Sequence, residues 1–330
     1  YIFSPDYQGF YVGLYFLYNA VLFSGLYCVV RRRGLGWLPV GLLGSTILAW
    51  TGLVLFDLGL FGTQSPRRAT AWFNNPNQLG YYATCLLSLV YLVYRESRLS
   101  MLAVLPWLAA AFILACFSLS KAAIVASLAC LPLMLKPHGT RAGKLHWALA
   151  VAGAAAVLGS LYYAGLFDDY AVVERITGMA REDDSSLSAR GYLAYRSASA
   201  WQLIFGQGYW SVIGRLGNEV HSTLAGLFIN YGLLALLLFG ALVVHWLRLT
   251  REAYGLAGMI SIAGPALLYG LTHNGIRFSL FWVLLAVSFA AAENRLAAGG
   301  YARRPAPAGS SALRDAPRVS GPSHAGAGLP

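Results

Sequence analysis

The segment 222–244, STLAGLFINYGLLALLLFGALVV, decides the fold class of this protein. It contains no Asp, Glu, Lys, Arg or His, and as a helix it is long enough to cross a hydrocarbon core of about 30 Å. A helix satisfies its backbone hydrogen bonds internally, which a segment surrounded by lipid must do. We therefore expect 222–244 to be a membrane-spanning α-helix.

Apolar runs of the same kind recur along most of the chain. The nine predicted spans are Phe10–Val30, Trp37–Phe56, Leu79–Tyr94, Met101–Phe117, Ala122–Leu135, Trp147–Phe167, Ser222–Val244, Leu256–Leu271 and Phe278–Ala292. Only Ser118–Lys121 separates the fourth from the fifth, so these two form either a tight hairpin or one broken helix. The expected fold is an all-α, polytopic transmembrane protein with about nine spans in this chain.

The composition of the whole chain agrees with this fold class. Of its 330 residues, 58% are hydrophobic and 11% are charged, and a water-soluble domain of this size could hardly cover such a core with polar surface. The four cysteines lie inside apolar runs, which excludes a disulfide framework and a CxxC metal site. No HExxH or similar ligand spacing occurs, so we expect neither a protein-bound metal nor another cofactor.

The net charge of +11 raises nucleic acid as a partner, but the positions of the cations favour membrane topology instead. If the loop after the first span is cytoplasmic, the cytoplasmic segments hold most of the 24 Lys and Arg residues. On the opposite face, the expected acids equal the expected cations in number, so that face is formally neutral. The partners that this distribution supports are membrane lipids, and nucleic acid loses its support.

The spans divide the chain into one large domain and a tail. Residues 1–298 form the predicted transmembrane domain, with a long outer loop at 168–221. Within that loop, Ser188–Phe205 mixes aromatic residues and arginines at helical spacing, as a helix lying in the membrane interface would. Residues 299–330 are rich in Pro, Gly, Ala and Ser and are expected to be a disordered cytoplasmic tail.

The ionisable side chains lie outside the predicted spans. Ion-coupled transporters and channels generally need ionisable or broken-helix sites near the middle of the bilayer, and the spans as drawn contain no ionisable residue. The polar residues gather instead on the outer face. This placement suggests a substrate whose lipid part lies in the membrane while its polar head projects outward.

Several arginines lie on the outer face against the usual topological bias. Guanidinium groups are planar, permanently charged forks that suit phosphate oxygens, so Arg175, Arg190, Arg196 and Arg215 are candidates for binding a diphosphate. The alternative is pairing with the acids of the same loop, which are Asp168, Asp169, Glu174, Glu182, Asp183 and Asp184. The sequence leaves both interpretations open.

His221 is the candidate general base. It immediately precedes the seventh span, where a neutral imidazole can accept a proton from a hydroxyl and a helix N-terminus favours an anion. Glu219 and the loop arginines strengthen this interpretation, whereas a histidine that merely anchors the interface is the alternative. His273 also lies on the outer face and is a candidate to converge with His221, although an interfacial turn built on Asn274-Gly275 is the favoured interpretation.

Four stretches, in this order, resemble motifs of a known family. FNNPNQLG at 73–80 resembles a G-N-P-N stretch, and SLSK at 118–121 stands where that family has an S-x-S-R-like turn. SARGY at 188–192, followed by FGQGY at 205–209, is similar to its arginine-containing helix and G-x-G turn. HSTL at 221–224, which runs into INYGLL at 229–234, resembles its H-N-x-x-L motif and the span that follows.

The family that these motifs resemble is the O-antigen ligase and O-antigen polymerase superfamily of bacterial membrane glycosyltransferases. Its members are polytopic proteins of the inner membrane whose active face is periplasmic. They move a glycan from an undecaprenyl-diphosphate carrier to the lipid A core or to another glycan, without a metal ion and with inversion. The resemblance therefore implies a glycosyltransferase with an undecaprenyl-diphosphate-linked donor and a lipid A core or glycan acceptor.

The resemblance also implies roles for particular residues. Arg190 and Arg175 would hold the diphosphate, and His221 would activate the acceptor hydroxyl. The remaining residues expected to bind diphosphate or glycan are Arg196, Arg215, Lys121, Asn77 and Glu219.

The chain departs from the family pattern in two places. Lys121 keeps a positive charge where the family has arginine but lacks the bidentate fork, and Ser222 with Thr223 replaces the usual asparagine. Because members commonly have more than nine spans, we expect further spans before Tyr1. The competing functions are a transporter or flippase for a lipid-linked glycan, and a non-catalytic subunit of a polysaccharide export complex.

Overall fold

The computed structural model describes residues 7–60, 69–97, 99–136, 191–217 and 219–302. All regular elements in these ranges are helical, and the predicted all-α class is confirmed for them. Three predictions lie wholly or partly outside the described residues: the span Trp147–Phe167, the part of the long loop at 168–190, and nearly all of the tail at 299–330.

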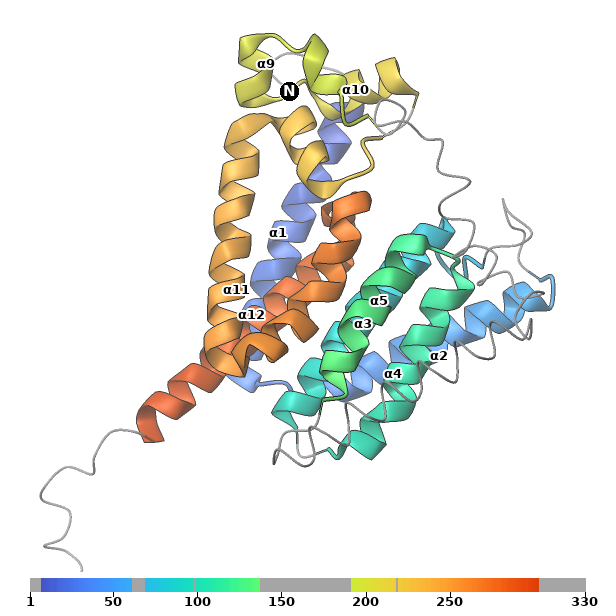
Figure 1. Ribbon diagram of the computed structural model, residues 1–330, viewed down its shortest axis with the longest axis vertical. Helices are drawn as coiled ribbons and strands as arrows, with labels where there is room; N and C mark the ends of the chain where they lie inside the picture. Colours follow the sequence, from blue (N-terminus) through green and yellow to red (C-terminus); the bar gives the residue numbers. More distant parts are fainter. Residues whose placement is uncertain (1–6, 61–68, 98, 137–190, 218, 303–330) are drawn as a thin grey trace, which may run out of the picture.

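The first half of the described chain contains five long helices. They are α1 (Tyr7–Arg33), α2 (Leu38–Asp57), α3 (Pro76–Glu96), α4 (Met101–Phe117) and α5 (Lys121–Met134). These bounds agree with the first five predicted spans to within a few residues. Figure 1 shows α2, α3, α4 and α5 packed side by side.

The second half begins with short elements and ends with two long ones. They are η1 (Ala194–Ser197), α9 (Ala200–Phe205), α10 (Tyr209–Leu216), α11 (Thr223–Thr272), η2 (Gly275–Arg277) and α12 (Ser279–Ala302). By length and composition, α1, α2, α11 and α12 are each able to cross a membrane, while α4 and α5 are apolar but shorter.

The central helix is α3, and its surroundings explain its composition. Every residue from Leu79 to Val93 is buried, because α4, α5, α11 and α12 pack around it. A helix enclosed by other helices can carry polar side chains if each finds a partner. Thr84 Oγ1 donates to the carbonyl oxygen of Tyr81 at 2.8 Å, and Ser88 Oγ donates to that of Thr84 at 3.3 Å. The hydroxyl groups of Thr84 and Ser88 are thus satisfied within the helix.

The segment Ser118–Lys121 is a tight hairpin, which decides between the two alternatives for the fourth and fifth spans. Leu119 has φ +48, so the α-helix cannot continue through it. Ser118 Oγ donates to the carbonyl oxygen of Ala115 at 2.7 Å and accepts from the backbone N–H of Ser120 at 3.1 Å. The hairpin packs against Gly80, where a Cβ would lie 2.8 Å from Ser118 Oγ.

Helix α11 differs from the prediction of two spans joined by a loop. The helix continues through residues 245–254, and the chain reverses direction at Gly255, which has φ +75. A straight helix of 50 residues would measure about 75 Å. Instead, its two ends meet, because Thr223 Oγ1 donates to the carbonyl oxygen of His273 at 3.1 Å. The predicted span ended where the apolar run ends, because hydropathy was the criterion. The helix itself continues through residues that include Arg248 and Arg251.

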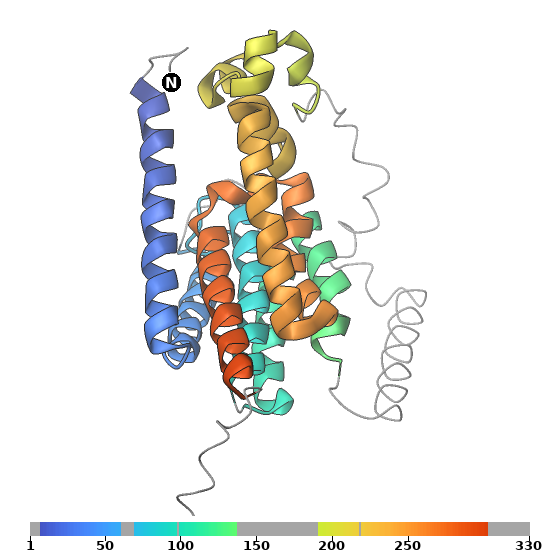
Figure 2. The ribbon, with the colours of Figure 1, turned by 90° about the vertical axis from the view of Figure 1, so that its left-hand side faces the viewer.

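Short helices cover one end of the bundle. Figures 1 and 2 show α9 and α10 across this end, next to the start of α11. Between them, Gln207 N–H donates to the carbonyl oxygen of Ile229 at 2.9 Å, and Gly208 N–H donates to that of Asn230 at 3.0 Å. These carbonyl groups accept bonds from outside the helix because α11 is interrupted at Gly232.

The contact between these segments requires glycine on both sides. Gly206 has φ +90 and Gly232 has φ +83, a region in which other residues are strained. A Cβ on Gly206 would lie 2.2 Å from the carbonyl oxygen of Asn230, and one on Gly232 would lie 2.1 Å from that of Ile204. Two of the stretches singled out in the sequence, 205–209 and 229–234, are therefore docked onto each other.

The two ends of the bundle carry different charged groups. We call the end that holds His221 and His273 the histidine end, and the end that holds Arg31, Arg95 and Arg295 the arginine end. Charge counting along the sequence places these two groups of residues on opposite faces, and in Figure 1 the start of α11 and the end of α1 lie at opposite ends of the bundle.

Candidate functional site

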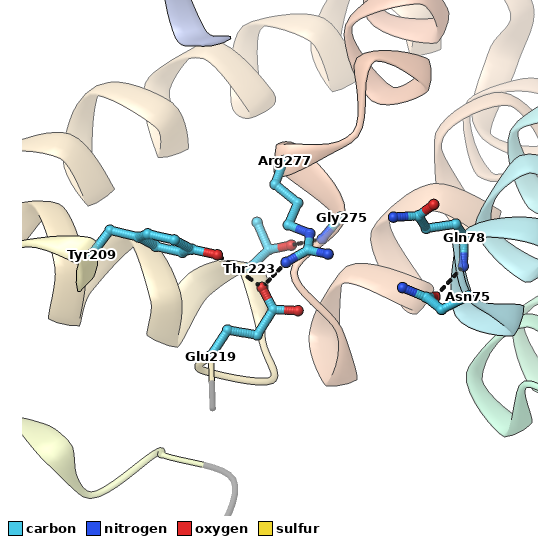
Figure 3. A network of polar contacts seen from close by, with 7 residues as sticks. All are labelled: Asn75, Gln78, Tyr209, Glu219, Thr223, Gly275 and Arg277. Atoms are coloured by element: carbon cyan, nitrogen blue, oxygen red, sulfur yellow. Dashed lines mark hydrogen bonds and ion pairs between the residues drawn. The ribbon is translucent and has the colours of Figure 1, made fainter. Parts of the chain in front are cut away.

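The histidine end brings together residues from elements that are distant in the sequence. Figure 3 shows the side chains of Tyr209, Glu219 and Arg277 directed toward one another, and it draws the Thr223–Gly275 and Asn75–Gln78 contacts as separate pairs. His221 is fixed here through its backbone, because Tyr192 OH donates to its carbonyl oxygen at 2.9 Å. The next residue, Ser222, caps α11 by accepting from the N–H of Ala225 at 3.4 Å.

The two histidines of this end lie close together. The ring centroids of His221 and His273 are 6.5 Å apart, with an angle of 56° between the ring planes. The ring of His273 also packs on that of Tyr269, with 4.8 Å between centroids. Both histidines are half-buried, so the two imidazoles can contact one small group bound between them. The convergence considered from the sequence is therefore present.

Glu219 and Arg277 form an ion pair across the site. The two residues are 58 positions apart, and their side chains are 24% and 31% exposed, respectively. Tyr209 OH donates to the same carboxylate oxygen, Glu219 Oε2, at 3.4 Å (Figure 3). Burial and the Glu219 carboxylate raise the pKa of Tyr209, while Arg277 acts in the opposite direction. The phenol therefore remains a protonated donor at neutral pH.

Arg277 is a member of this cluster that the site prediction missed. Its partner lies too far away in the sequence for a local pattern to connect the two residues. One signal was nonetheless available: Arg277 is an arginine in a short segment on the predicted outer face, where the positive-inside bias disfavours it.

Two hydrogen bonds of the Thr223 side chain fix the backbone of the segment that carries His273 and Arg277. We call this arrangement the clamp. Thr223 Oγ1 accepts from the N–H of Gly275 at 2.9 Å and donates to the carbonyl oxygen of His273 at 3.1 Å. Gly275 lies flat against Tyr81, where a Cβ would be 3.1 Å from the phenol oxygen. The clamp thus joins η2 both to the first residue of α11 and to α3.

Asn77 and Lys121 lie at this end as well. Tyr269 OH donates to the backbone carbonyl oxygen of Asn77 at 2.9 Å, which ties the start of α3 to the end of α11. That start is capped by Asn75, whose side chain accepts from the N–H of Gln78 at 3.0 Å (Figure 3). Lys121 begins α5 directly after the hairpin that packs on Gly80, and it is partly buried.

The outer arginines have different positions. Arg215 is exposed, and it donates to Ser197 Oγ at 2.6 Å and to Gln207 Oε1. Arg196 is exposed at the end of η1. For Arg215, the structure supplies local partners, and the loop acids that the sequence suggested lie outside the described residues. Arg175 and Arg190 lie outside the described residues.

The site combines several kinds of chemical group. The imidazoles of His221 and His273 offer proton acceptors, and the starts of α3 and α11 present helix N-termini that favour an anion. Within the described ranges, no cluster of three or more His, Cys, Asp or Glu side chains could hold a metal ion. The arrangement suits proton transfer from a hydroxyl next to a bound anion.

Comparison of the chain with protein-family models, with curated proteins and with solved structures found no match. The resemblance to the O-antigen ligase and polymerase superfamily is therefore carried by the quoted motifs alone.

Proposed function

We propose that this protein is a membrane glycosyltransferase that moves a glycan from an undecaprenyl-diphosphate carrier to an acceptor sugar at the periplasmic face of the bacterial inner membrane. The observation that carries the proposal is the facing pair His221 and His273 beside the Glu219–Arg277 ion pair, at one end of a bundle of apolar helices. The nine-span topology, with the histidine end in the periplasm, is part of the proposal.

The reaction assigns a role to the imidazole of His221. The acceptor hydroxyl attacks the anomeric carbon of the donor sugar, and its proton passes to a nitrogen of His221. A new C–O glycosidic bond forms while the bond between the anomeric carbon and the carrier breaks, and its electron pair leaves with the diphosphate. General-base assistance of this kind contributes about 10²- to 10⁴-fold to a rate.

The leaving diphosphate requires positive groups near the breaking bond. Among the described residues, Lys121 at the start of α5 and the N-termini of α3 and α11 are candidates for this role. The sequence adds Arg190 and Arg175. Cations that are fixed in place before the reaction stabilise the growing negative charge more than the ground state, which accelerates the transfer.

Replacement of His221 by alanine tests the proposal. In membranes supplied with a carrier-linked glycan and an acceptor, His221→Ala should lower transfer by about 10²-fold or more while its amount in the membrane is unchanged. The matched control is His245→Ala, because His245 lies inside α11 against the ring of Phe289, with centroids 5.2 Å apart. Undiminished transfer by His221→Ala would overturn the site assignment.

Arg190→Ala tests whether this arginine binds the diphosphate, and analysis of the products tests whether the carrier bond is cleaved. Loss of a diphosphate-binding arginine should reduce transfer strongly, because the leaving group then lacks a charge-assisted bond. Release of undecaprenyl diphosphate as the glycan is transferred distinguishes a glycosyltransferase from a flippase or a structural subunit. Either of those proteins would leave the carrier bond intact.

A further inference from the structure

A small cavity adjoins the Glu219–Arg277 pair on the side that faces α1. It has a volume of about 230 Å³ and lies between α1, α10, the start of α11 and η2. We call it the tyrosine cavity. The lining residues that matter here are Tyr15, Phe16, Tyr209, Tyr231, Asn274 and Arg277. Pockets for drug-sized ligands measure about 300–1,000 Å³, so this volume corresponds to a single small group such as one sugar ring.

The aromatic walls of the tyrosine cavity are held by contacts of their own. Phe16 packs edge-on against Tyr231, with 5.5 Å between ring centroids. Tyr15 OH lies within hydrogen-bonding distance of Ser279 Oγ, at 3.2 Å, and Tyr209 OH is engaged with Glu219. Rigid aromatic faces with polar edges suit a ligand that has both apolar C–H faces and hydroxyl groups.

One polar group in the wall lacks a partner. Asn274 is 9% exposed, and its Oδ1 has no hydrogen-bond partner among the residues that the structure describes. Gly226 lies beside this side chain, and a Cβ there would be in van der Waals contact with Asn274 Nδ2 at 3.5 Å. Buried acceptors in proteins are almost always satisfied, so the environment calls for a hydrogen-bond donor here. A ligand hydroxyl is such a donor.

The charge of the lining selects between neutral and anionic ligands. Among the described residues that line the tyrosine cavity, Arg277 alone has a charged side chain, and Glu219 neutralises it. A phosphate or carboxylate would have to compete with Glu219 for Arg277. It would also lie near the unpaired oxygen of Asn274, which repels an anion. A neutral ligand meets neither penalty.

We propose that the tyrosine cavity binds one neutral sugar ring of the glycan, with a sugar hydroxyl donating to Asn274 Oδ1. The aromatic side chains cover the faces of the ring, and the Glu219–Arg277 pair lies at its edge. This inference rests on the proposed function, because it names the class of sugar that the same end of the bundle accepts.

Binding of free sugars to the purified full chain in detergent tests the inference without any transfer reaction. The probes are glucose, galactose, mannose and N-acetylglucosamine, each compared with glucuronate and inorganic phosphate by saturation-transfer NMR. At least one neutral sugar should bind, and neither anion should compete with it. Asn274→Leu should weaken this binding about tenfold or more, because it removes the acceptor.

The matched control is Asn230→Leu. Asn230 is 3% exposed and its Oδ1 also lacks a partner among the described residues, but it does not line the tyrosine cavity. It should bind the sugar like the unmodified protein. Val12→Trp provides a second test from α1, because it fills the cavity and leaves every polar group of the site in place. That variant should lose the neutral sugar completely.

Three results would overturn the inference: no neutral sugar binds, an anion binds in preference, or Val12→Trp binds as well as the unmodified protein. The catalytic proposal has a separate readout. His221→Ala should bind the sugar normally although transfer is lost. If transfer persists in His221→Ala, the catalytic assignment fails while the sugar site stands; if sugar binding is absent while transfer depends on His221, the reverse is true.

Discussion

The two ends of the bundle each contain a cavity. The larger cavity has fewer polar lining groups that lack a hydrogen-bond partner. The cavity at the arginine end measures about 530 Å³, and its polar lining residues are Glu96, Ser97 and Asn294. Each of these has a partner: Glu96 pairs with Arg295 at 3.0 Å, Ser97 accepts from Leu99, and Asn294 donates to the carbonyl oxygen of Val30. The tyrosine cavity measures about 230 Å³ and has an unpaired buried oxygen.

Ion pairs at the arginine end have a different use as well. Arg31 pairs with Glu293 at 3.2 Å and thereby joins α1 to α12, and the Glu96–Arg295 pair joins α3 to α12. At the histidine end, the Glu219–Arg277 pair borders a cavity and lies near two histidines. The comparison teaches that cavity volume and unmet hydrogen-bonding capacity need not coincide, because the smaller cavity is the one whose described lining includes a buried oxygen without a hydrogen-bond partner.

The largest expected effect comes from breaking the contact that builds the histidine end. Gly232→Ala places a Cβ against the backbone of Ile204 at a φ that alanine disfavours, so it should cost about 3 kcal/mol or more of stability. Thermal unfolding in detergent measures the loss. Gly240→Ala in the same helix is the control, since nothing lies within 4 Å of its Cβ. Equal unfolding temperatures for the two variants would contradict the close backbone contact.

The next largest effect distinguishes the Glu219–Arg277 pair of the histidine end from the Glu96–Arg295 pair of the arginine end. Glu219→Gln leaves the Arg277 charge unopposed beside the tyrosine cavity, so transfer should fall about tenfold or more, by the size of a lost charged hydrogen bond. The same variant should allow glucuronate to bind. Glu96→Gln breaks a pair that only joins helices, and it should leave transfer unchanged and lower stability by about 0.2–1 kcal/mol.

Transfer assays and glucuronate-binding measurements on Glu219→Gln and Glu96→Gln test this difference. If the two variants had the same effect on transfer, the difference that we draw between the ends would disappear.

The smallest effect concerns the pH dependence of stability. The pKa of Tyr209 is raised in the folded state, so its contribution is fully present below the ordinary tyrosine pKa of about 10 and is lost as pH rises through the folded value. Tyr209→Phe should therefore unfold with a weaker dependence on pH above about 10. Unfolding midpoints over this alkaline range measure it, with Tyr195→Phe as the control. An unchanged alkaline slope would show that Tyr209 is not the group responsible.

Much of the fold follows from the sequence, because span prediction needs only local hydropathy. Runs such as Met101–Phe117 match the helices directly, and Ser118–Lys121 forms a turn at the expected place. The full burial of α3 was missed because it depends on which helices pack around it, and the continuation of α11 through 245–254 was missed because it extends beyond the apolar run. A hydropathy profile contains no information about such partners.

In the site as well, local features were predictable from the sequence, whereas features that depend on packing were not. His221 precedes a helix as its position indicated, and it lies near His273, which was considered as a partner. The Glu219–Arg277 pair and the approach of Gly206 to Gly232 join residues that are far apart in the chain. Their pairing is decided by packing, so no local pattern of residue types could have revealed it.

The meeting of the two ends of α11 has a consequence for the order of synthesis. The segment that contains His221 and Thr223 leaves the ribosome before the second half of α11 has been translated. The Thr223 hydroxyl can therefore form its hydrogen bonds with His273 and Gly275 only later. Closing so long a segment carries an entropic cost that neighbouring contacts do not. The histidine end is therefore completed only after the ribosome has passed Arg277. A nascent chain released earlier would lack the site.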